Sequence, residues 1–234
     1  DISGVANARL KQFDAALEDY SKAIKINPQS AEIYNNRGIA LDQIGQLDEA
    51  IESYEQALTI NPDYAEALSN MGLALKGKGD LESAMVKFKQ AIKINPTDAN
   101  TYHNIGMTLN DMGADEAAIT SFKQAIEINP NFSEAYFSMA NSLRYQGNFE
   151  VAILNYKHAL KIKPDFAEAY NNMGNALDDK GDVEAAINSF KQALKIKPDF
   201  ADAYNNMGVA LNDKGEVEAA IDSFKQALKI KPDF

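Results

Sequence analysis

The sequence predicts an all-α fold, a solenoid in which helical hairpins of one length are stacked along the chain. Three observations predict it: apolar residues at helical spacing, regularly spaced glycines and regularly spaced prolines. Twelve of the thirteen glycines fall into two sets spaced by multiples of 34 residues. We call positions related in this way a column. The prolines form one column without exception: Pro28, Pro62, Pro96, Pro130, Pro164, Pro198 and Pro232.

The 34-residue period divides the chain into repeats that form one continuous solenoid domain. A partial or degenerate repeat is expected at the start, followed by six whole ones. The last two whole repeats differ at only five of 34 positions. The predicted boundaries are 1–30, 31–64, 65–98, 99–132, 133–166, 167–200 and 201–234.

Each repeat is predicted to contain two helices, as 167–200 illustrates. Gly181 is expected to end the first helix in a left-handed conformation, and Asp182 to cap the second. Pro198 ends the second helix, because it has no N–H to donate and disfavours helical backbone before it. The first helix carries the small Gly174 within an apolar face made of Tyr170, Met173, Ala176 and Leu177.

Acids beside the repeat boundaries predict capping boxes at the start of several first helices. The predicted pairs are Asp63 with Glu66, Asp165 with Glu168, and Asp199 with Asp202.

Two alanine columns indicate where helices approach closely, and a column of aromatic rings between them should fill the space between neighbouring hairpins. The rings are Tyr20, Tyr54, Phe88, Phe122, Tyr156, Phe190 and Phe224.

This pattern resembles the tetratricopeptide repeat, with Tyr, Leu and Gly in the first helix, Ala–Phe/Tyr–Ala in the second, and then Pro. The resemblance covers all six whole repeats and implies a right-handed superhelix whose first helices line an inner, concave groove. Three single positions depart from it: Arg37 in a Met or Ile column, Asp115 in an apolar column, and Ala140 in a glycine column.

The opening segment 1–30 departs furthest from the pattern. Asn7 and Lys11 stand where a first helix should show Leu and the turn should show Gly. The apolar residues of the segment nevertheless run at helical spacing without a glycine break: Leu10, Phe13, Leu17, Tyr20 and Ile24.

Catalytic and metal-binding chemistry has little support. The chain has no cysteine and only two histidines, His103 and His158, which are expected at the surface. The segment GKGD at 77–80 follows a predicted helix and lacks the ending of a phosphate-binding loop, so it is an interhelical turn. We therefore expect no catalytic residue, metal or cofactor in this chain.

The formal net charge of −11 disfavours nucleic acids and anionic membranes as partners, since both require clustered Lys and Arg. The chain has no apolar run long enough to cross a bilayer and no secretory signal pattern at its start. A cytoplasmic location is the expectation.

Asparagines recur inside the predicted first helices, where asparagine is a mediocre helix former. One interpretation is that each amide bonds to a neighbouring helix and fixes the stacking. The other is a ladder that brackets the peptide units of a bound extended chain, because an amide offers both a donor and an acceptor. The main column holds Asn36, Asn70, Asn104, Asn172 and Asn206, accompanied by Asn35, Asn171 and Asn205.

The segment NNMGN at 171–175 is similar to the asparagine-rich segments in the repeat region of O-GlcNAc transferases. That resemblance implies a peptide-binding groove of broad specificity. Apolar anchors toward its middle include Phe137 and Tyr145, while Asn141 and Asn175 make the later repeats more polar.

The columns that line the groove by this resemblance are acidic. They contain ten acids and two basic residues, Lys76 and Arg144, so their net charge is −8. Acids are favoured in first helical turns by the helix dipole alone, but without the five acids expected there the net charge is still −3. Neutral or basic partners are therefore expected. The acids are Glu32, Asp42, Glu66, Asp111, Glu134, Glu168, Asp178, Asp179, Asp202 and Asp213.

The sequence thus predicts a non-catalytic scaffold that binds an extended peptide or protein segment. The alternative is a substrate-recruiting arm of a larger enzyme, such as a glycosyltransferase, whose catalytic domain lies outside this chain. Weak end-to-end association through uncapped terminal repeats is a further expectation, because Ile221, Phe224 and Leu228 repeat a buried pattern.

Overall fold

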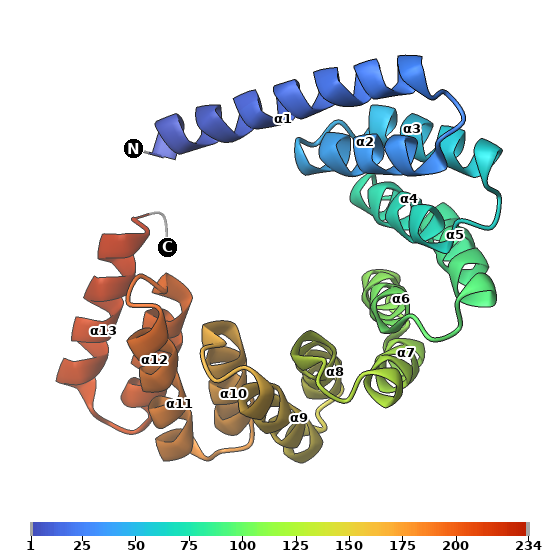
Figure 1. Ribbon diagram of the computed structural model, residues 1–234. Helices are drawn as coiled ribbons and strands as arrows, with labels where there is room; N and C mark the ends of the chain where they lie inside the picture. The colour runs from blue at the N-terminus through green and yellow to red at the C-terminus, as the bar shows by residue number, and fades with distance from the viewer. Residues whose placement is uncertain (1, 233–234) are drawn as a thin grey trace. The chain divides into compact units, whose positions relative to one another are not determined.

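The computed structural model describes residues 2–232, with side chains from residue 12 onward. The described residues form thirteen α-helices and no strand (Figure 1). The chain divides into two compact units, Asp1–Gly113 and Ala114–Phe234. The helices are α1 (Ile2–Ile26), α2 (Ala31–Gln43), α3 (Leu47–Ile60), α4 (Ala65–Gly77), α5 (Leu81–Ile94), α6 (Ala99–Asp111), α7 (Asp115–Ile128), α8 (Ser133–Tyr145), α9 (Phe149–Ile162), α10 (Ala167–Asp179), α11 (Val183–Ile196), α12 (Ala201–Asp213) and α13 (Val217–Ile230).

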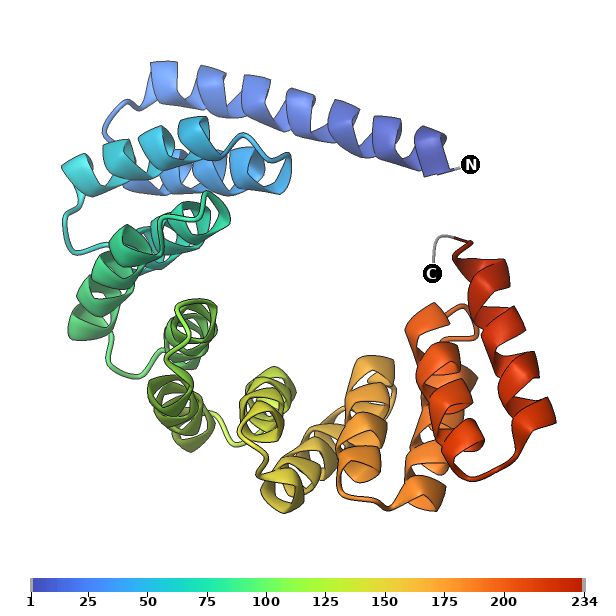
Figure 2. The same ribbon diagram turned by 180° about the vertical axis from the view of Figure 1, so that it is seen from behind.

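Within each unit, consecutive helices pair into antiparallel hairpins that stack on one another, as the all-helical solenoid prediction requires (Figure 2). The first unit contains α1, the hairpins α2/α3 and α4/α5, and α6. The second contains α7 and the hairpins α8/α9, α10/α11 and α12/α13.

Turns and helix ends follow the glycine and proline columns. Gly181 follows α10 with φ +90°, and its N–H donates to the Asp178 carbonyl at 2.8 Å. The Asp182 side chain accepts from the N–H of Ala185 and so caps α11, as predicted. The second helix of this repeat ends at Ile196, two residues before Pro198.

The predicted capping boxes are wrong. The N-cap positions of α4, α10 and α12 are Tyr64, Phe166 and Phe200, and none of the three makes a side-chain capping bond. Each helix begins one residue later than the predicted box requires, so the acid before it lies outside the cap position. In α6 the same column holds Asp98, which accepts from the N–H of Asn100 at 3.1 Å.

The core is made by the small and aromatic columns of the second helices. Five rings are at most 1% exposed, and the alanines on either side of them are buried as well. Tyr54, Phe88 and Phe190 each lie against a glycine of the other helix of their hairpin, and Tyr156 packs on Phe137 of α8. Burying a large side chain in such a place contributes about 1.5–3 kcal/mol. The five rings are Tyr54, Phe88, Phe122, Tyr156 and Phe190.

The opening segment is one continuous 25-residue helix, α1, and not a hairpin. The turn that would divide it falls at Lys11, whereas the six later turns each have glycine with φ between +75° and +90°. Side chains other than glycine are strained in that conformation, so the helix continues through this position.

Among the six whole repeats, Arg37 is the one polar residue in a column that otherwise holds buried Met or Ile. Met71, one repeat later, packs in the cluster of Leu41, Ala50 and Tyr54 from the preceding hairpin, so Arg37 takes the corresponding place on the α1 side of α2. Its guanidinium is half-buried, and Nη1 donates to Ser53 Oγ at 3.0 Å.

Arg37→Met should stabilise the packing of α1 by about 1 kcal/mol, because it removes the cost of desolvating the guanidinium and restores apolar contact. Hydrogen exchange in residues 13–26 and the melting temperature measure the effect. The reciprocal variant Met71→Arg should lower stability. A lower melting temperature for Arg37→Met would contradict this account of the interface.

Candidate functional site

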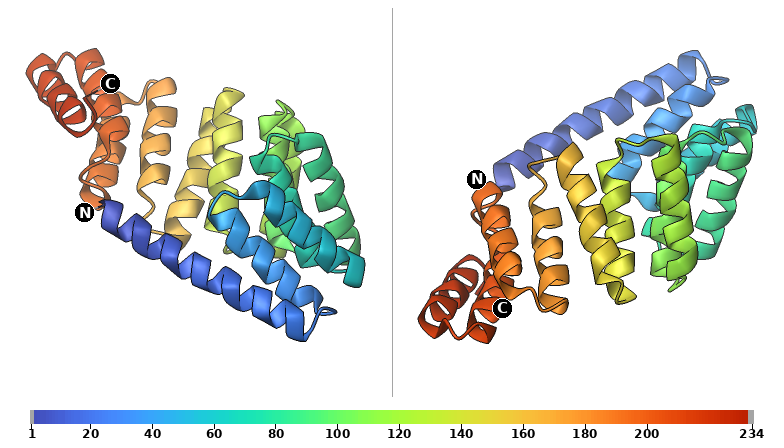
Figure 3. Two further views of the ribbon diagram at one scale, coloured as in Figure 1. Left: turned by 90° about the horizontal axis from the view of Figure 1, so that it is seen from above. Right: turned by 90° about the horizontal axis from the view of Figure 1, so that it is seen from below.

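The first helices of the repeats line a concave face in each unit. In the first unit α2 contacts α4 and α4 contacts α6, and in the second α8 contacts α10 and α10 contacts α12. Successive second helices within a unit, such as α9 and α11, make no such contact in the described residues. Because first helices lie closer together, each stack curves toward them. Figure 3 shows the helices of each unit side by side. The asparagine column lies on the first helices.

In the first unit only some of the asparagines form hydrogen bonds with one another. Asn70 Nδ2 donates to Asn35 Oδ1 at 3.0 Å, which joins α4 to α2. Asn35 is fully buried, and its Nδ2 lies 3.5 Å from Tyr64 Oη and 3.4 Å from Glu66 Oε1. Two further members of the column are half-buried and make no side-chain hydrogen bond to any described residue: Asn36 and Asn104.

In the second unit four asparagines form a continuous chain of hydrogen bonds, which we call the amide chain. Asn206 Nδ2 donates to Asn171 Oδ1 at 3.0 Å, and Asn171 Nδ2 donates to Asn172 Oδ1 at 3.1 Å. Asn172 Nδ2 then donates to Asn141 Oδ1 at 2.9 Å. Asn141 Oδ1 also accepts from Tyr156 Oη at 2.6 Å. The chain therefore links α12, α10, α8 and α9.

The choice of partner follows from the residue that the preceding repeat offers. Asn70 and Asn206 bond to an asparagine 35 residues earlier. The residue 35 before Asn172 is Phe137, which has no acceptor, so Asn172 reaches Asn141 instead. Interhelical bonding is thus found for three members of the column. Two more predicted residues, Asn175 and Asn205, are half-buried without a side-chain hydrogen bond in the described part of the chain.

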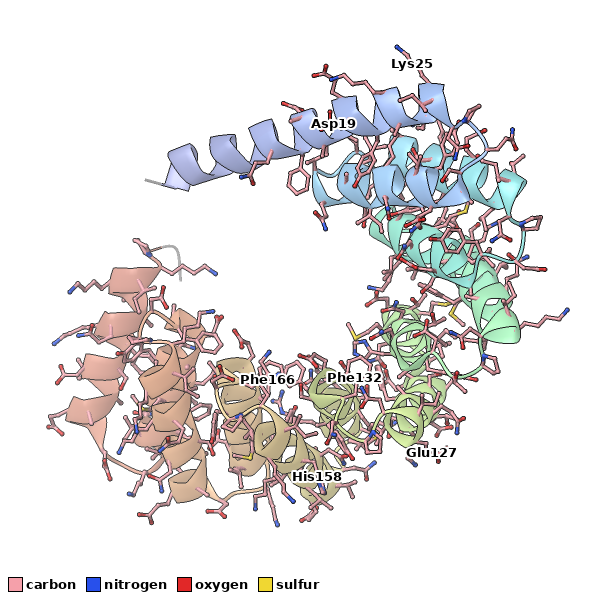
Figure 4. The ribbon with its side chains drawn as sticks, viewed as in Figure 1. Asp19, Lys25, Glu127, Phe132, His158 and Phe166 are labelled. Carbon is pink, nitrogen blue, oxygen red and sulfur yellow. The ribbon has the colours of Figure 1, made fainter. Side chains whose placement is uncertain are left out.

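The two aromatic residues predicted for the site lie eight positions apart on α8. The Phe137 ring packs against Phe166, at 4.8 Å between centroids, and against Tyr156, at 6.1 Å. Phe166 precedes α10 and is labelled between α8 and α10 in Figure 4. Tyr145, by contrast, is 80% exposed.

Both basic residues of the predicted groove are engaged by acids of the next repeat. Lys76 Nζ lies 2.8 Å from Asp111 Oδ2, and Arg144 Nε lies 2.7 Å from Asp179 Oδ2. Glu134 and Glu168 are also paired, at 3.5 and 3.4 Å, with the lysines that directly follow α9 and α11. The other six acids make no ion pair with described residues: Glu32, Asp42, Glu66, Asp178, Asp202 and Asp213.

Negative charge is most crowded near the ends of α10 and α12. Burial raises the pKa of the Asp178 carboxyl, and the neighbouring Asp213 and Asp179 raise it further. Burial also raises the pKa of Asp42. An added cation would therefore be favoured beside Asp178.

No three His, Cys, Asp or Glu residues among those described are grouped so that they could hold a metal ion. His158, labelled in Figure 4, is exposed and stacks on Tyr136 with ring centroids 5.3 Å apart. Within residues 2–232, the helices are all too short or too polar to cross a lipid bilayer.

Comparison with solved structures finds similar chains in several proteins. A crystal structure of MamA is 28% identical and covers 69% of this chain and 95% of its own, with a TM-score of 0.65. YrrB, described as a TPR protein with an unusual peptide-binding site, is 25% identical and covers 85% of this chain and 99% of its own, with a TM-score of 0.63.

A third structure is similar in fold alone. The Cut9–Hcn1 tetramer of the APC/C contains a chain that is 17% identical, with a TM-score of 0.78. It matches 95% of this chain, which spans only 44% of that longer one.

Protein-family models match nearly the whole sequence, while no curated protein matches it significantly. A model described as TPR repeat matches 6–45, 43–79, 77–113, 140–181 and 174–212. Two further models are both described as tetratricopeptide repeat. One matches 99–132 and 201–234, and the other matches 121–153. The chain belongs to the tetratricopeptide repeat family.

Proposed function

We propose that this chain is a non-catalytic protein–protein interaction scaffold that binds extended peptide segments on its concave faces. The observation that carries the proposal is the set of half-buried asparagines on the first helices whose amide groups have no partner among the described residues: Asn36, Asn104, Asn175 and Asn205. An unpaired amide can both donate to and accept from a peptide unit. YrrB, at 25% identity, is a repeat protein described as having a peptide-binding site.

The fully buried asparagines have another role in this proposal. Asn35 and Asn171 are at most 5% exposed and hydrogen-bonded on both sides, so they hold neighbouring first helices together. The asparagines without a described partner face the ligand in this proposal. The two interpretations of the sequence pattern therefore apply to different residues, even within one column: Asn171 bonds to Asn206 and Asn172, whereas Asn205, one repeat later, is left for a ligand.

The partner is expected to be neutral or basic. Lys76 and Arg144 are both neutralised by carboxylates, while six acids of the same columns make no ion pair within the described part of the chain. The same charge disfavours nucleic acid and anionic membrane surfaces. The similarity to O-GlcNAc transferases, the cytoplasmic location and the weak end-to-end association remain predictions.

The triple variant Asn36→Ala, Asn104→Ala, Asn205→Ala tests the proposal on an immobilised array of random-sequence 15-residue peptides. Binding should fall about tenfold or more, since each lost hydrogen bond contributes about 0.5–1.5 kcal/mol. The melting temperature should stay the same or rise, because alanine is the better helix former. For the unaltered chain, basic peptides should bind more tightly than acidic ones, and the difference should shrink at 1 M salt.

The matched control removes the same kind of amide from the opposite side of each hairpin. Gln56, Gln90 and Gln192 are exposed on second helices, so replacing them by Ala should leave peptide binding unchanged. Equal losses in the two triple variants, or no loss in either, would refute binding on the concave faces.

A further inference from the structure

One first helix of the second unit carries an aromatic, amide, aromatic series on one face, which we call the α8 stripe: Phe137, Asn141 and Tyr145. Residues four apart lie one above another on a helix, and eight residues cover about 12 Å of its length. The same columns hold two amides and an acid in α10, and an amide, a valine and an acid in α12. The two aromatic rings are therefore particular to the stripe.

The amide in the middle of the stripe can only donate to a ligand. Asn141 Oδ1 accepts from both Tyr156 Oη and Asn172 Nδ2, which uses both lone pairs of a carbonyl oxygen. Rotating the Asn141 amide alone by 180° would place two NH₂ groups against each other, so its orientation is set by the amide chain as a whole. Asn141 is half-buried, and its Nδ2 has no partner among the described residues.

The two rings provide apolar surface at two positions along α8, one on either side of Asn141. Phe137 is held in place by Phe166 and Tyr156, so little conformational freedom remains to be lost when a ligand packs on it. Tyr145 projects into solvent. Next to it, Arg144 pairs with Asp179, and Asp178 and Asp213 continue the acidic surface across α10 and α12.

A proline residue fits this combination better than other residues do. It has a backbone carbonyl but no N–H, so it loses nothing at a site that donates and does not accept. Its ring packs on aromatic side chains, and proline-rich segments are already extended before binding. Acidic surface on one side favours Lys or Arg beside the proline.

We propose that the α8 stripe is the specificity-determining subsite of this scaffold and binds proline in an extended, basic segment of a partner protein. A ligand carbonyl at the proline accepts from Asn141 Nδ2, the pyrrolidine ring packs on Tyr145 or Phe137, and a flanking Lys or Arg faces Asp178 and Asp213. The inference rests on the proposed binding of peptides to the concave faces.

The test uses the full chain and three synthetic 12-residue peptides in fluorescence anisotropy. The first contains prolines separated by two residues, with two lysines; the second replaces each proline by alanine; the third replaces each proline by leucine. The proline peptide should bind at least about tenfold more tightly than the other two. Tyr145→Ala, at an exposed position, should remove this preference.

Asn141→Asp removes the donor with almost no change in shape. The carboxylate still accepts from Tyr156 and Asn172, so the amide chain is retained, but it cannot donate to the ligand. It should reduce binding of the proline peptide to the level of the alanine peptide. The control Asn188→Asp adds the same charge at an exposed position of α11, a second helix, and should preserve the preference for proline.

Three other outcomes would overturn the proline assignment, the subsite or the proposed function. Equal binding of the leucine and proline peptides would overturn the proline assignment and leave a general apolar subsite. Insensitivity to both Tyr145→Ala and Asn141→Asp would overturn the stripe as the subsite, even if the array still detects peptide binding sensitive to Asn36, Asn104 and Asn205. Absence of binding by every peptide on the array and in solution would overturn the proposed function together with this inference.

Discussion

Phe190→Ala should lower the free energy of unfolding of the second unit by about 3–5 kcal/mol. The Phe190 ring on α11 is 1% exposed and lies against Gly174 of α10, between alanines that are themselves fully buried. Small neighbours cannot expand to fill the space of a phenyl ring, so the substitution loses the transfer free energy and also leaves a cavity.

Phe224→Ala is the matched control, because Phe224 is the same residue type one repeat later and lies against Gly208 in the same way. Phe224 is only half-buried in this chain, so its replacement should cost roughly half as much. Urea denaturation followed by circular dichroism gives the loss, and hydrogen exchange in α10 and α11 locates it. Equal losses at the two positions would mean that ring burial does not set the stability of the hairpins.

Sequence columns predicted the hairpins because each column has one physical role in every repeat. Gly181 and its equivalents must adopt positive φ, Pro198 must end a helix, and the aromatic column must be buried for the hairpins to stack. The exceptions were interpretable for the same reason: Lys11 lacks the freedom of glycine, and α1 continues through it.

Capping could not be predicted as well, because it depends on a single residue of register. Acids beside Pro62, Pro164 and Pro198 matched the spacing of a capping box, but the N-cap position of each helix is the aromatic residue that follows the acid. Asp98 occupies the true cap column, and it is the one acid there. Comparing this column across repeats would have identified the cap position.

The candidate site was less predictable because it depends on pairs of residues from different repeats. The sequence singled out the asparagine column, yet which amides are used in interhelical bonds depends on the residue 35 positions earlier, and that residue varies. The saturation of Asn141 also requires Tyr156, which comes from another helix. Glu134 and Glu168 likewise pair with lysines that a count over the groove columns does not include, so the surface is less acidic than that count suggests.

Gly174→Ala should destabilise the second unit by about 1–3 kcal/mol, although alanine is the better helix former by about 1 kcal/mol. A Cβ atom at position 174 would lie 2.5 Å from Phe190 Cε1, well inside van der Waals contact. The ring cannot retreat, because it is packed on all sides at 1% exposure. The added methyl group must therefore push α10 away from α11 or force the ring from its preferred rotamer.

Gly77→Ala is the control, since it makes the same substitution at the last residue of α4. A Cβ atom there would meet only the flexible end of Leu47 at 3.2 Å, so this variant should be neutral or slightly stabilising.

A double variant separates a steric clash from a change in helix propensity. Phe190→Leu shortens the side chain that the new methyl group meets, so Gly174→Ala with Phe190→Leu should be less destabilised than the sum of the two single variants. The measured quantity is the coupling free energy from urea denaturation of all four proteins. Additive losses would show that the close approach of Gly174 to the ring does not limit this position, and that the glycine column is needed for some reason other than space.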